Sequence, residues 1–207
     1  MKRLITFTVV FTVVFCTSCK EKPDNGGGGG EDTTVVIPPK KYVIGGYYNV
    51  NGVEGIVYKI IGEDSTKGMI VSLDETDARW GNNVETGAID ADNGQKNMEK
   101  IKAKGIEDYP AFKWCDDKKN GWYLPAQNEL WDVAKIHRDI QDSLEVYGGN
   151  KLSSASDYWS STERFNPGAP AGTEYQSAYT VRLSDAFISP DGVDRTTVRK
   201  VRAVRSF

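Results

Sequence analysis

Tyr-Trp-Ser-Ser-Thr-Glu, residues 158–163, sets two aromatic rings beside three hydroxyls and a carboxylate, in a region otherwise rich in glycine, proline and charge. Buried rings contribute large apolar areas, whereas buried polar groups need hydrogen-bond partners. The stretch therefore predicts a structural staple, with rings in the core and polar groups bonded to backbone or to arginines of the closing strand, residues 201–205. Its members are Tyr158, Trp159, Ser160, Ser161, Thr162 and Glu163.

The segments around this staple favour an α+β domain. An Asn51-Gly52 turn between residues 42–50 and 53–61 is typical of a β-hairpin. Helical spacing of apolar residues follows, and strand-like runs return after the staple. Strands, then helices, then strands indicate α+β. The expected strands are 42–50, 53–61, 69–73, 156–161, 176–183, 186–189 and 197–204, and the expected helices are 94–105, 108–119 and 125–149.

The amino-terminal end is typical of an exported protein. Two cations precede an apolar run, residues 4–15, that is too short to span a bilayer. Small residues then precede Cys19, in the manner of the lipobox that bacterial lipoprotein signal peptidase recognises. Residues 1–18 are therefore predicted to be a signal peptide and Cys19 the lipidated first residue. Plain secretory cleavage beside a coincidental cysteine is the alternative.

Residues 19–40 contain five consecutive glycines together with prolines and charges, which predicts a flexible tether. The remaining residues, 41–207, are long enough to bury a core as one domain. Together these segments predict a domain held at a membrane through a lipid at Cys19. The charged residues 20–22 resemble the export tags of Bacteroidetes surface lipoproteins, which implies the outer membrane and the cell surface, with a periplasmic face as the alternative.

Charge argues against nucleic acid as a partner. The chain has 26 basic and 29 acidic residues, and loss of residues 1–18 with their two cations gives 24 − 29 = −5. A nucleic-acid-binding domain is expected to have a basic excess. A basic cluster does occur near the carboxyl end, but acids lie just upstream of it, so paired charges on a solvated sheet are predicted. The cluster comprises Arg195, Arg199, Lys200, Arg202 and Arg205.

Catalytic and metal-binding patterns are weak. His137 is the one histidine and is expected to be half-exposed on a helix, while Cys115 shares an apolar face and is expected in the core. Ser160 and Ser161 lack the Gly-x-Ser-x-Gly turn of a serine nucleophile. Residues 90–94 offer oxygens, but their register does not fit a calcium loop. No metal, no cofactor and no enzymatic activity are predicted.

Four sequence blocks, in order, resemble one family. They are YPAFKWCDD (109–117), GWYLPAQNELWDV (121–133), YWSSTE (158–163) and VRAVRSF (201–207). They look like the C-type-lectin-like family that includes the C-terminal domain of a Legionella collagen-like adhesin and many Bacteroidetes surface lipoproteins. The resemblance implies short antiparallel sheets, two to three helices, and paired N- and C-terminal strands.

The same fold houses the formylglycine-generating enzymes, so a related enzyme is one alternative. Their late cysteine pair is absent here, because no cysteine follows Cys115. A structural subunit of an outer-membrane lipoprotein complex is another alternative. The favoured hypothesis is an adhesin-like or receptor-like domain that binds a protein or a glycan.

The resemblance also implies where a ligand would bind. In Bacteroidetes, members of this family are often targets of diversity-generating retroelements, which vary residues between the YWSSTE block and the closing strand. Few asparagines and a Pro- and Gly-rich insertion, residues 164–175, depart from that pattern. The candidate ligand-binding residues are Arg164, Phe165, Tyr175, Thr180, Arg182, Ser184, Asp185 and Phe187.

Overall fold

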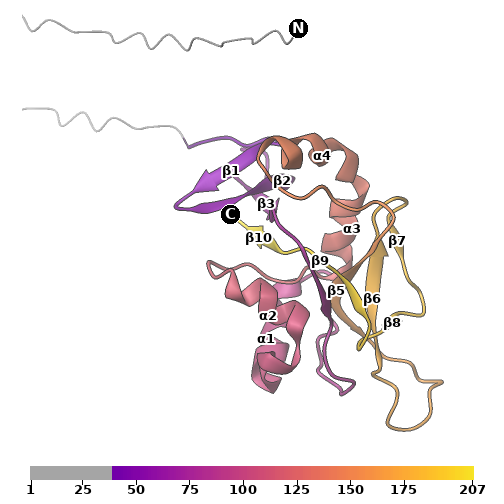
Figure 1. The fold of residues 1–207 in the computed structure, drawn as a ribbon. Coiled ribbons are helices and arrows are strands. Elements are labelled where there is room, and N and C mark those ends of the chain that lie inside the picture. Colours follow the sequence, from indigo (N-terminus) through magenta and orange to yellow (C-terminus); the bar gives the residue numbers. More distant parts are fainter. Residues whose placement is uncertain (1–38) are drawn as a thin grey trace, which may run out of the picture. The chain divides into compact units, whose positions relative to one another are not determined.

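The first sheet begins at the predicted hairpin. In the computed structural model, which describes residues 39–207, β1 (Tyr47–Val50) and β2 (Val53–Ile61) pair antiparallel. Asn51 and Gly52 have φ of 53° and 75°, the left-handed pair that a two-residue hairpin requires. β3 (Lys67–Val71) and β10 (Val204–Ser206) complete the order β1-β2-β3-β10 (Figure 1).

This strand order corrects the expectation that the N-terminal and C-terminal strands pair with each other. The closing strand β10 does join the sheet of the amino-terminal strands, but its neighbour is β3, and β1 lies at the opposite edge. Val204 pairs with Val71, and both are fully buried. The closing strand therefore takes the edge at which its apolar side chain enters the core.

The second sheet contains the staple. Its order is β4-β9-β5-β6-β7, and β8 pairs with the opposite end of β6. Its pairs are antiparallel except for β5 and β9, which run parallel where Tyr158 meets Lys200. The strands are β4 (Thr76–Arg79), β5 (Asp157–Arg164), β6 (Ser177–Arg182), β7 (Phe187–Ile188), β8 (Val193–Asp194) and β9 (Val198–Val201).

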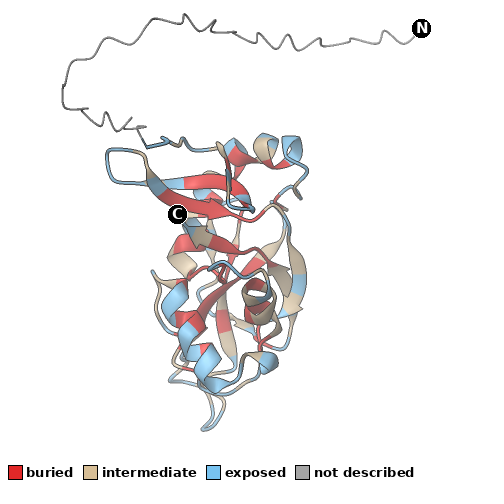
Figure 2. Cartoon of the chain, turned by 90° about the vertical axis from the view of Figure 1, so that its left-hand side faces the viewer, coloured by how far each residue is buried: buried red, intermediate tan, exposed pale blue. Residues whose placement is uncertain are grey.

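The described residues contain four α-helices, one more than expected. They are α1 (Gly94–Lys104), α2 (Pro110–Asp117), α3 (Gln127–Lys135) and α4 (His137–Val146), with a 3₁₀ turn at Ile106–Asp108. The mixed α+β class is confirmed. Figure 2 shows buried residues along the strands and inner helix faces, and exposed ones on outer turns and loops.

The extra helix arises because the expected helix 125–149 breaks at Ile136, whose φ and ψ are −114° and 11°. The carbonyl of Ala134 would accept the N–H four residues later in a continuous helix. Instead Nδ1 of His137 lies 2.7 Å from it. His137 is buried, so its expected half-exposed position was wrong. A side chain inserted into the hydrogen-bond ladder is a common cause of helix breaks.

Within residues 39–207, no helix combines the length and the apolar character needed to cross a bilayer. The predicted signal peptide and Cys19 lie outside the described residues. So does the predicted tether, apart from Pro39 and Lys40. These three predictions remain predictions.

Candidate ligand-binding surface

All six residues of the staple are buried. The register between β5 and β6 shifts between Trp159 and Glu163, so the intervening groups bond elsewhere. The N–H of Ser161 donates to the carbonyl of Pro125 at 2.7 Å, and the hydroxyl of Thr162 donates to the carbonyl of Asp90 at 3.0 Å. The hydroxyl of Ser160 donates across the sheet to Tyr179 O. The segment thus joins β6 to two distant loops.

Glu163 ends the staple in a fully buried ion pair. Its carboxylate accepts Nη1 of Arg195 at 2.9 Å and the N–H groups of Thr86 and Gly87 at 3.0 and 2.9 Å. Burial lowers the pKa of Arg195, and the Glu163 charge opposes that shift. The predicted bonds to backbone are present at Glu163, whereas its arginine partner, Arg195, lies upstream of residues 201–205.

Arg195 extends this pair to the surface loop. Its Nη2 donates to the carbonyls of Val84 and Tyr175, and its guanidinium lies 4.6 Å from the Trp80 ring centre. Arg195 and Arg202 are both buried, which corrects the expectation of a solvated basic cluster. A guanidinium has five N–H donors in one plane, so a buried arginine can donate to several carbonyls at once. These bonds replace the water that surrounds a solvated arginine.

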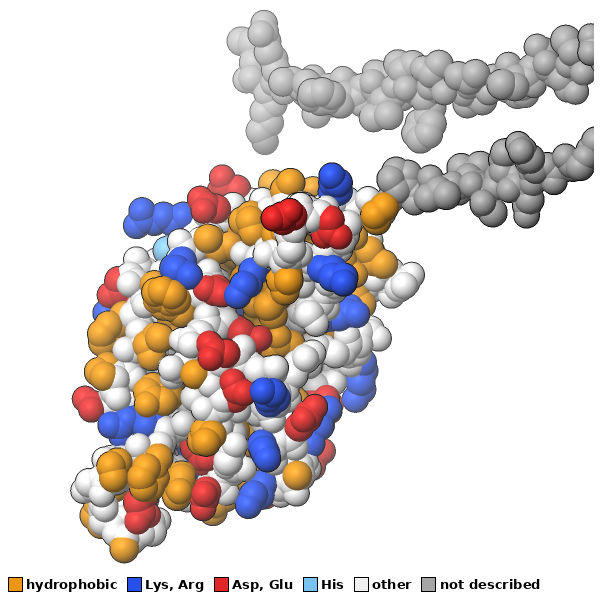
Figure 3. All heavy atoms as spheres, turned by 180° about the vertical axis from the view of Figure 1, so that it is seen from behind, with side chains coloured by type: hydrophobic (Ala, Val, Ile, Leu, Met, Phe, Trp, Pro, Cys, Tyr) orange, Lys and Arg blue, Asp and Glu red, His pale blue; other side chains and the backbone are white. Residues whose placement is uncertain are grey.

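The loop that Arg195 holds, residues 165–176, carries the first group of candidate residues. Phe165 is 51% exposed, and its ring centre lies 5.2 Å from that of Tyr175. The N–H of Asn166 donates to the carbonyl of Glu174 at 2.9 Å and closes the base of the loop. Figure 3 shows the loop projecting from one end of the domain at lower left.

A hollow of about 440 Å³ opens between this loop and the turn before β8. Polar groups dominate its lining, including Asn166, Gln176 and Asp194. Arg164 forms one wall: its Nε donates to the carbonyl of Pro190 at 3.0 Å and its Nη2 lies 3.6 Å from Asp191. The hollow is within the ~300–1,000 Å³ typical of small-ligand sites.

The second group of candidate residues lies at the turn between β6 and β7. Arg182 contacts Asp185 through a two-bond ion pair, with Nη2 to Oδ2 at 2.7 Å. The exposed ring of Phe187 lies 5.2 Å from the guanidinium carbon. Ser184 donates to the same Asp185 at 3.3 Å. The polar groups of these side chains therefore bond to one another at the turn.

The two groups do not form one surface. β6 separates the 165–176 loop at Ser177 from the turn after Arg182, a distance of about 17 Å at ~3.3 Å per residue. Apolar residues at 179, 181 and 183 alternate with polar ones at 180, 182 and 184, which predicted that Thr180 faces solvent. Thr180 is buried, so that prediction was wrong. β6 is an interior strand with neighbours on both sides, and Thr180 stands opposite the buried Trp159.

The residues considered as catalytic candidates have internal roles. Burial raises the pKa of Cys115 well above its usual value, so the thiol stays protonated. His137 contacts the helix break, and Ser161 accepts the side-chain N–H of Asn97 at 2.9 Å. Among the described residues, no group of three or more His, Cys, Asp or Glu is placed to hold a metal ion.

Sequence reasoning missed a buried acid, Glu129, which joins α1 to α3. Its Oε2 accepts the N–H groups of Gly94 and Ala126 at 3.0 and 2.8 Å, and its Oε1 accepts the hydroxyl of Tyr123 at 2.8 Å. Burial raises the pKa of Glu129 in spite of these bonds. A Glu three residues after a helix N-cap is the available sequence signal.

Glu129→Gln is expected to make stability less dependent on pH. Because the folded pKa is raised, the folded protein binds the proton more tightly, and this stabilisation is lost as pH rises from about 4.5 through the folded pKa. Glutamine can keep all three bonds by reversing the one to Tyr123. Urea denaturation from pH 4 to 7 should show the stability of the variant, relative to the native chain, rising with pH. A constant difference would contradict it.

Comparisons with known proteins place the fold. No protein-family model and no curated protein matches the chain. The structure is similar to the crystal structure of a fimbrial protein from Bacteroides ovatus, with a TM-score of 0.53 and 19% sequence identity. The match covers 68% of this chain and 36% of that one, so the chain spans about a third of the fimbrial protein. The likeness concerns the fold alone, which is shared with this fimbrial protein.

Proposed function

We propose that the protein is a cell-envelope lipoprotein, anchored at Cys19 in the outer membrane, whose domain binds a protein or glycan without catalysing a reaction. The binding surface is the 165–176 loop with its adjoining hollow. The observation that carries this proposal is the attachment of an exposed loop to a fully buried ion pair through the Tyr175 carbonyl.

Attachment of the 165–176 loop to the buried Arg195 favours a role of this loop in ligand binding. The loop projects from the sheet, yet its base is closed between Asn166 and Glu174 and its end is held by Arg195. A loop fixed before the ligand arrives loses less conformational entropy on binding. Exposed aromatic rings beside a polar hollow are typical binding anchors. Phe165 supplies an exposed ring, and the half-buried ring of Tyr175 packs against it.

The internal roles of Cys115, His137 and the staple serines favour a non-enzymatic protein. A general base must reach its proton, and a nucleophile must be activated. A protonated buried thiol and a histidine engaged at a helix break offer neither function. The proposal therefore assigns recognition, and no turnover, to the domain.

One observation favours a second candidate, a structural subunit of a surface assembly. The fold is shared with a fimbrial protein, a class named for surface filaments. Co-purification of the full chain with envelope proteins in fixed stoichiometry would favour this candidate. Binding to a separately supplied ligand would favour the first.

The test compares two phenylalanines of similar exposure at opposite ends of β6, Phe165 at 51% and Phe187 at 46%. The full chain is applied in detergent to arrays of glycans and of surface proteins. Phe165→Ala is expected to weaken binding at least tenfold, because it removes an exposed aromatic anchor. Phe187→Ala is the control and should change affinity less than twofold. Loss with Phe187→Ala alone, or no binding by the native chain, would overturn the proposal.

A further inference from the structure

Two further hollows lie on either side of Trp122, away from the 165–176 loop. One of about 470 Å³ extends along α1, and one of about 360 Å³ extends to the β1–β2 turn. Asn120 and Trp122 line both. In Figure 1 the β1–β2 hairpin lies above α1 and α2, and the chain that leaves α2 passes between them. The two hollows thus adjoin along this segment.

The larger hollow has a balanced polar rim over an apolar floor. Glu99 and Lys102 come from α1, Asp116 comes from the last turn of α2, and Lys119 follows that helix. Lys102 and Asp116 form an ion pair at 2.6 Å between the two helices.

The floor is provided by Met98 and Trp122, which are 5% and 8% exposed. Two acids and two bases leave the rim without net charge. It therefore offers both donors and acceptors.

Lys119 stands in a conformation that favours glycine. Its φ is 62°, and its N–H donates to the carbonyl of Asp116 at the end of α2. Glycine is the usual residue at such a left-handed helix terminus, since it has no Cβ to strain. Here a lysine occupies the position at a conformational cost, and its side chain is 73% exposed beside the hollow.

We infer that this hollow is a second binding site, for an uncharged saccharide of one or two rings. A ligand of either net charge would compete with the existing Lys102–Asp116 pair. Sugar hydroxyls both donate and accept, which matches a rim of ammonium, carboxylate and amide groups. The apolar floor suits the carbon face of a sugar ring. The volume lies within the usual range for small-ligand sites.

An array of neutral and acidic glycans, probed with the full chain in detergent, tests this site. The test variant is Gln95→Ala with Glu99→Ala, since both residues line the hollow and are exposed on α1. Lys100→Ala is the matched control, because it is exposed on the same helix and does not line the hollow. The double variant is expected to lose at least tenfold in affinity for a neutral glycan. The control should change by less than twofold.

Phe165→Ala separates this site from the 165–176 surface. Its binding to the neutral glycan should stay within twofold of the native chain, whatever it does to a ligand of the loop. Three results would overturn the inference: no neutral glycan bound by the native chain, binding to acidic glycans alone, or full affinity in the double variant. A circular dichroism spectrum identical to that of the native chain establishes that the double variant is folded.

Discussion

Replacing Arg195 by methionine is expected to lower the free energy of unfolding by about 3–5 kcal/mol, the usual loss when one partner of a buried ion pair is removed. The Glu163 carboxylate would lose its cationic partner in a site where both side chains are fully buried. The carbonyls of Val84 and Tyr175 would also lose their donor. The shift of the urea midpoint at pH 7 measures the effect, with the slope of the transition showing whether unfolding stays two-state.

Two comparisons test the cause. Arg182→Met removes an arginine with the same kind of partner, Asp185, but in an exposed pair, and should change stability little. Adding Glu163→Gln to Arg195→Met removes the unpaired charge and should recover part of the loss, because the amide oxygen can still accept from Thr86 and Gly87. A loss no larger in Arg195→Met than in Arg182→Met would contradict the argument.

Arg195 also shows where sequence reasoning stops. Its place among charged residues indicated a solvated cluster, and no spacing links residue 195 to residue 163. The available signal is physical: an acid that ends a buried aromatic and hydroxyl segment needs a cation or several N–H donors. This signal predicts that Glu163 has a partner, but it does not identify Arg195 as that partner. The fold makes the choice: β8 pairs with β6, β9 pairs with β5, and Arg195 lies between β8 and β9 in the chain.

The fold class was predictable, because hairpin and helix signals act locally. Asn51-Gly52 determines its turn, and Pro110 begins α2 as a proline at a first helical turn should. Burial at Thr180 was not predictable, since alternation shows one apolar face and cannot show that the other face is also covered. The break at Ile136 coincides with a side-chain contact of His137 on the Ala134 carbonyl, which no periodicity reveals.

The exposed loop was predictable as a region of the chain, whereas the separation of the candidate residues into two groups was not. A Pro- and Gly-rich stretch after the staple indicated an exposed loop, and residues 165–176 project from the domain. The eight candidate residues separate into two groups because β6 runs between them. The candidate residues are therefore close in sequence, but β6 places the two groups at its opposite ends.

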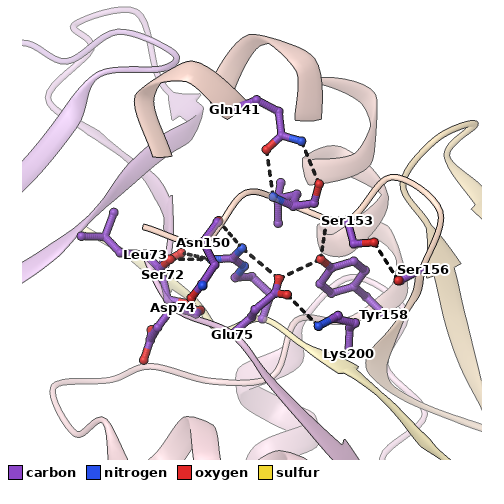
Figure 4. A network of polar contacts seen from close by, with 12 residues as sticks. Ser72, Leu73, Asp74, Glu75, Gln141, Asn150, Ser153, Ser156, Tyr158 and Lys200 are labelled. Atoms are coloured by element: carbon purple, nitrogen blue, oxygen red, sulfur yellow. Dashed lines mark hydrogen bonds and ion pairs between the residues drawn. The ribbon is translucent and has the colours of Figure 1, made fainter. Parts of the chain in front are cut away.

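Arg202 joins the two sheets as Arg195 joins the staple to its loop. Its guanidinium donates to the carbonyls of Ser72, Leu73 and Asn150 at 2.9, 2.8 and 2.7 Å and to Glu75 at 3.0 Å. Glu75 also accepts from Lys200 and Tyr158, as Figure 4 shows. Burial, and then the Glu75 charge, raise the pKa of Tyr158, so its hydroxyl remains a donor.

Arg202→Met is expected to cost about 3–5 kcal/mol of unfolding free energy, because it leaves the Glu75 carboxylate and three carbonyls without this donor. Arg202→Lys should also destabilise, since one ammonium cannot reproduce a planar fork that reaches four acceptors. Urea denaturation of both variants at pH 7 measures the losses.

Lys200→Met is the matched control for charge at Glu75. Its ammonium lies 2.9 Å from the same carboxylate, but its side chain is 26% exposed, so its loss should stay below about 1 kcal/mol. A stability of Arg202→Lys equal to that of the native chain would show that charge alone is required at this position. The ordering Arg202→Met, then Arg202→Lys, then Lys200→Met from largest to smallest loss follows if the bonds to the three carbonyls hold the sheets together.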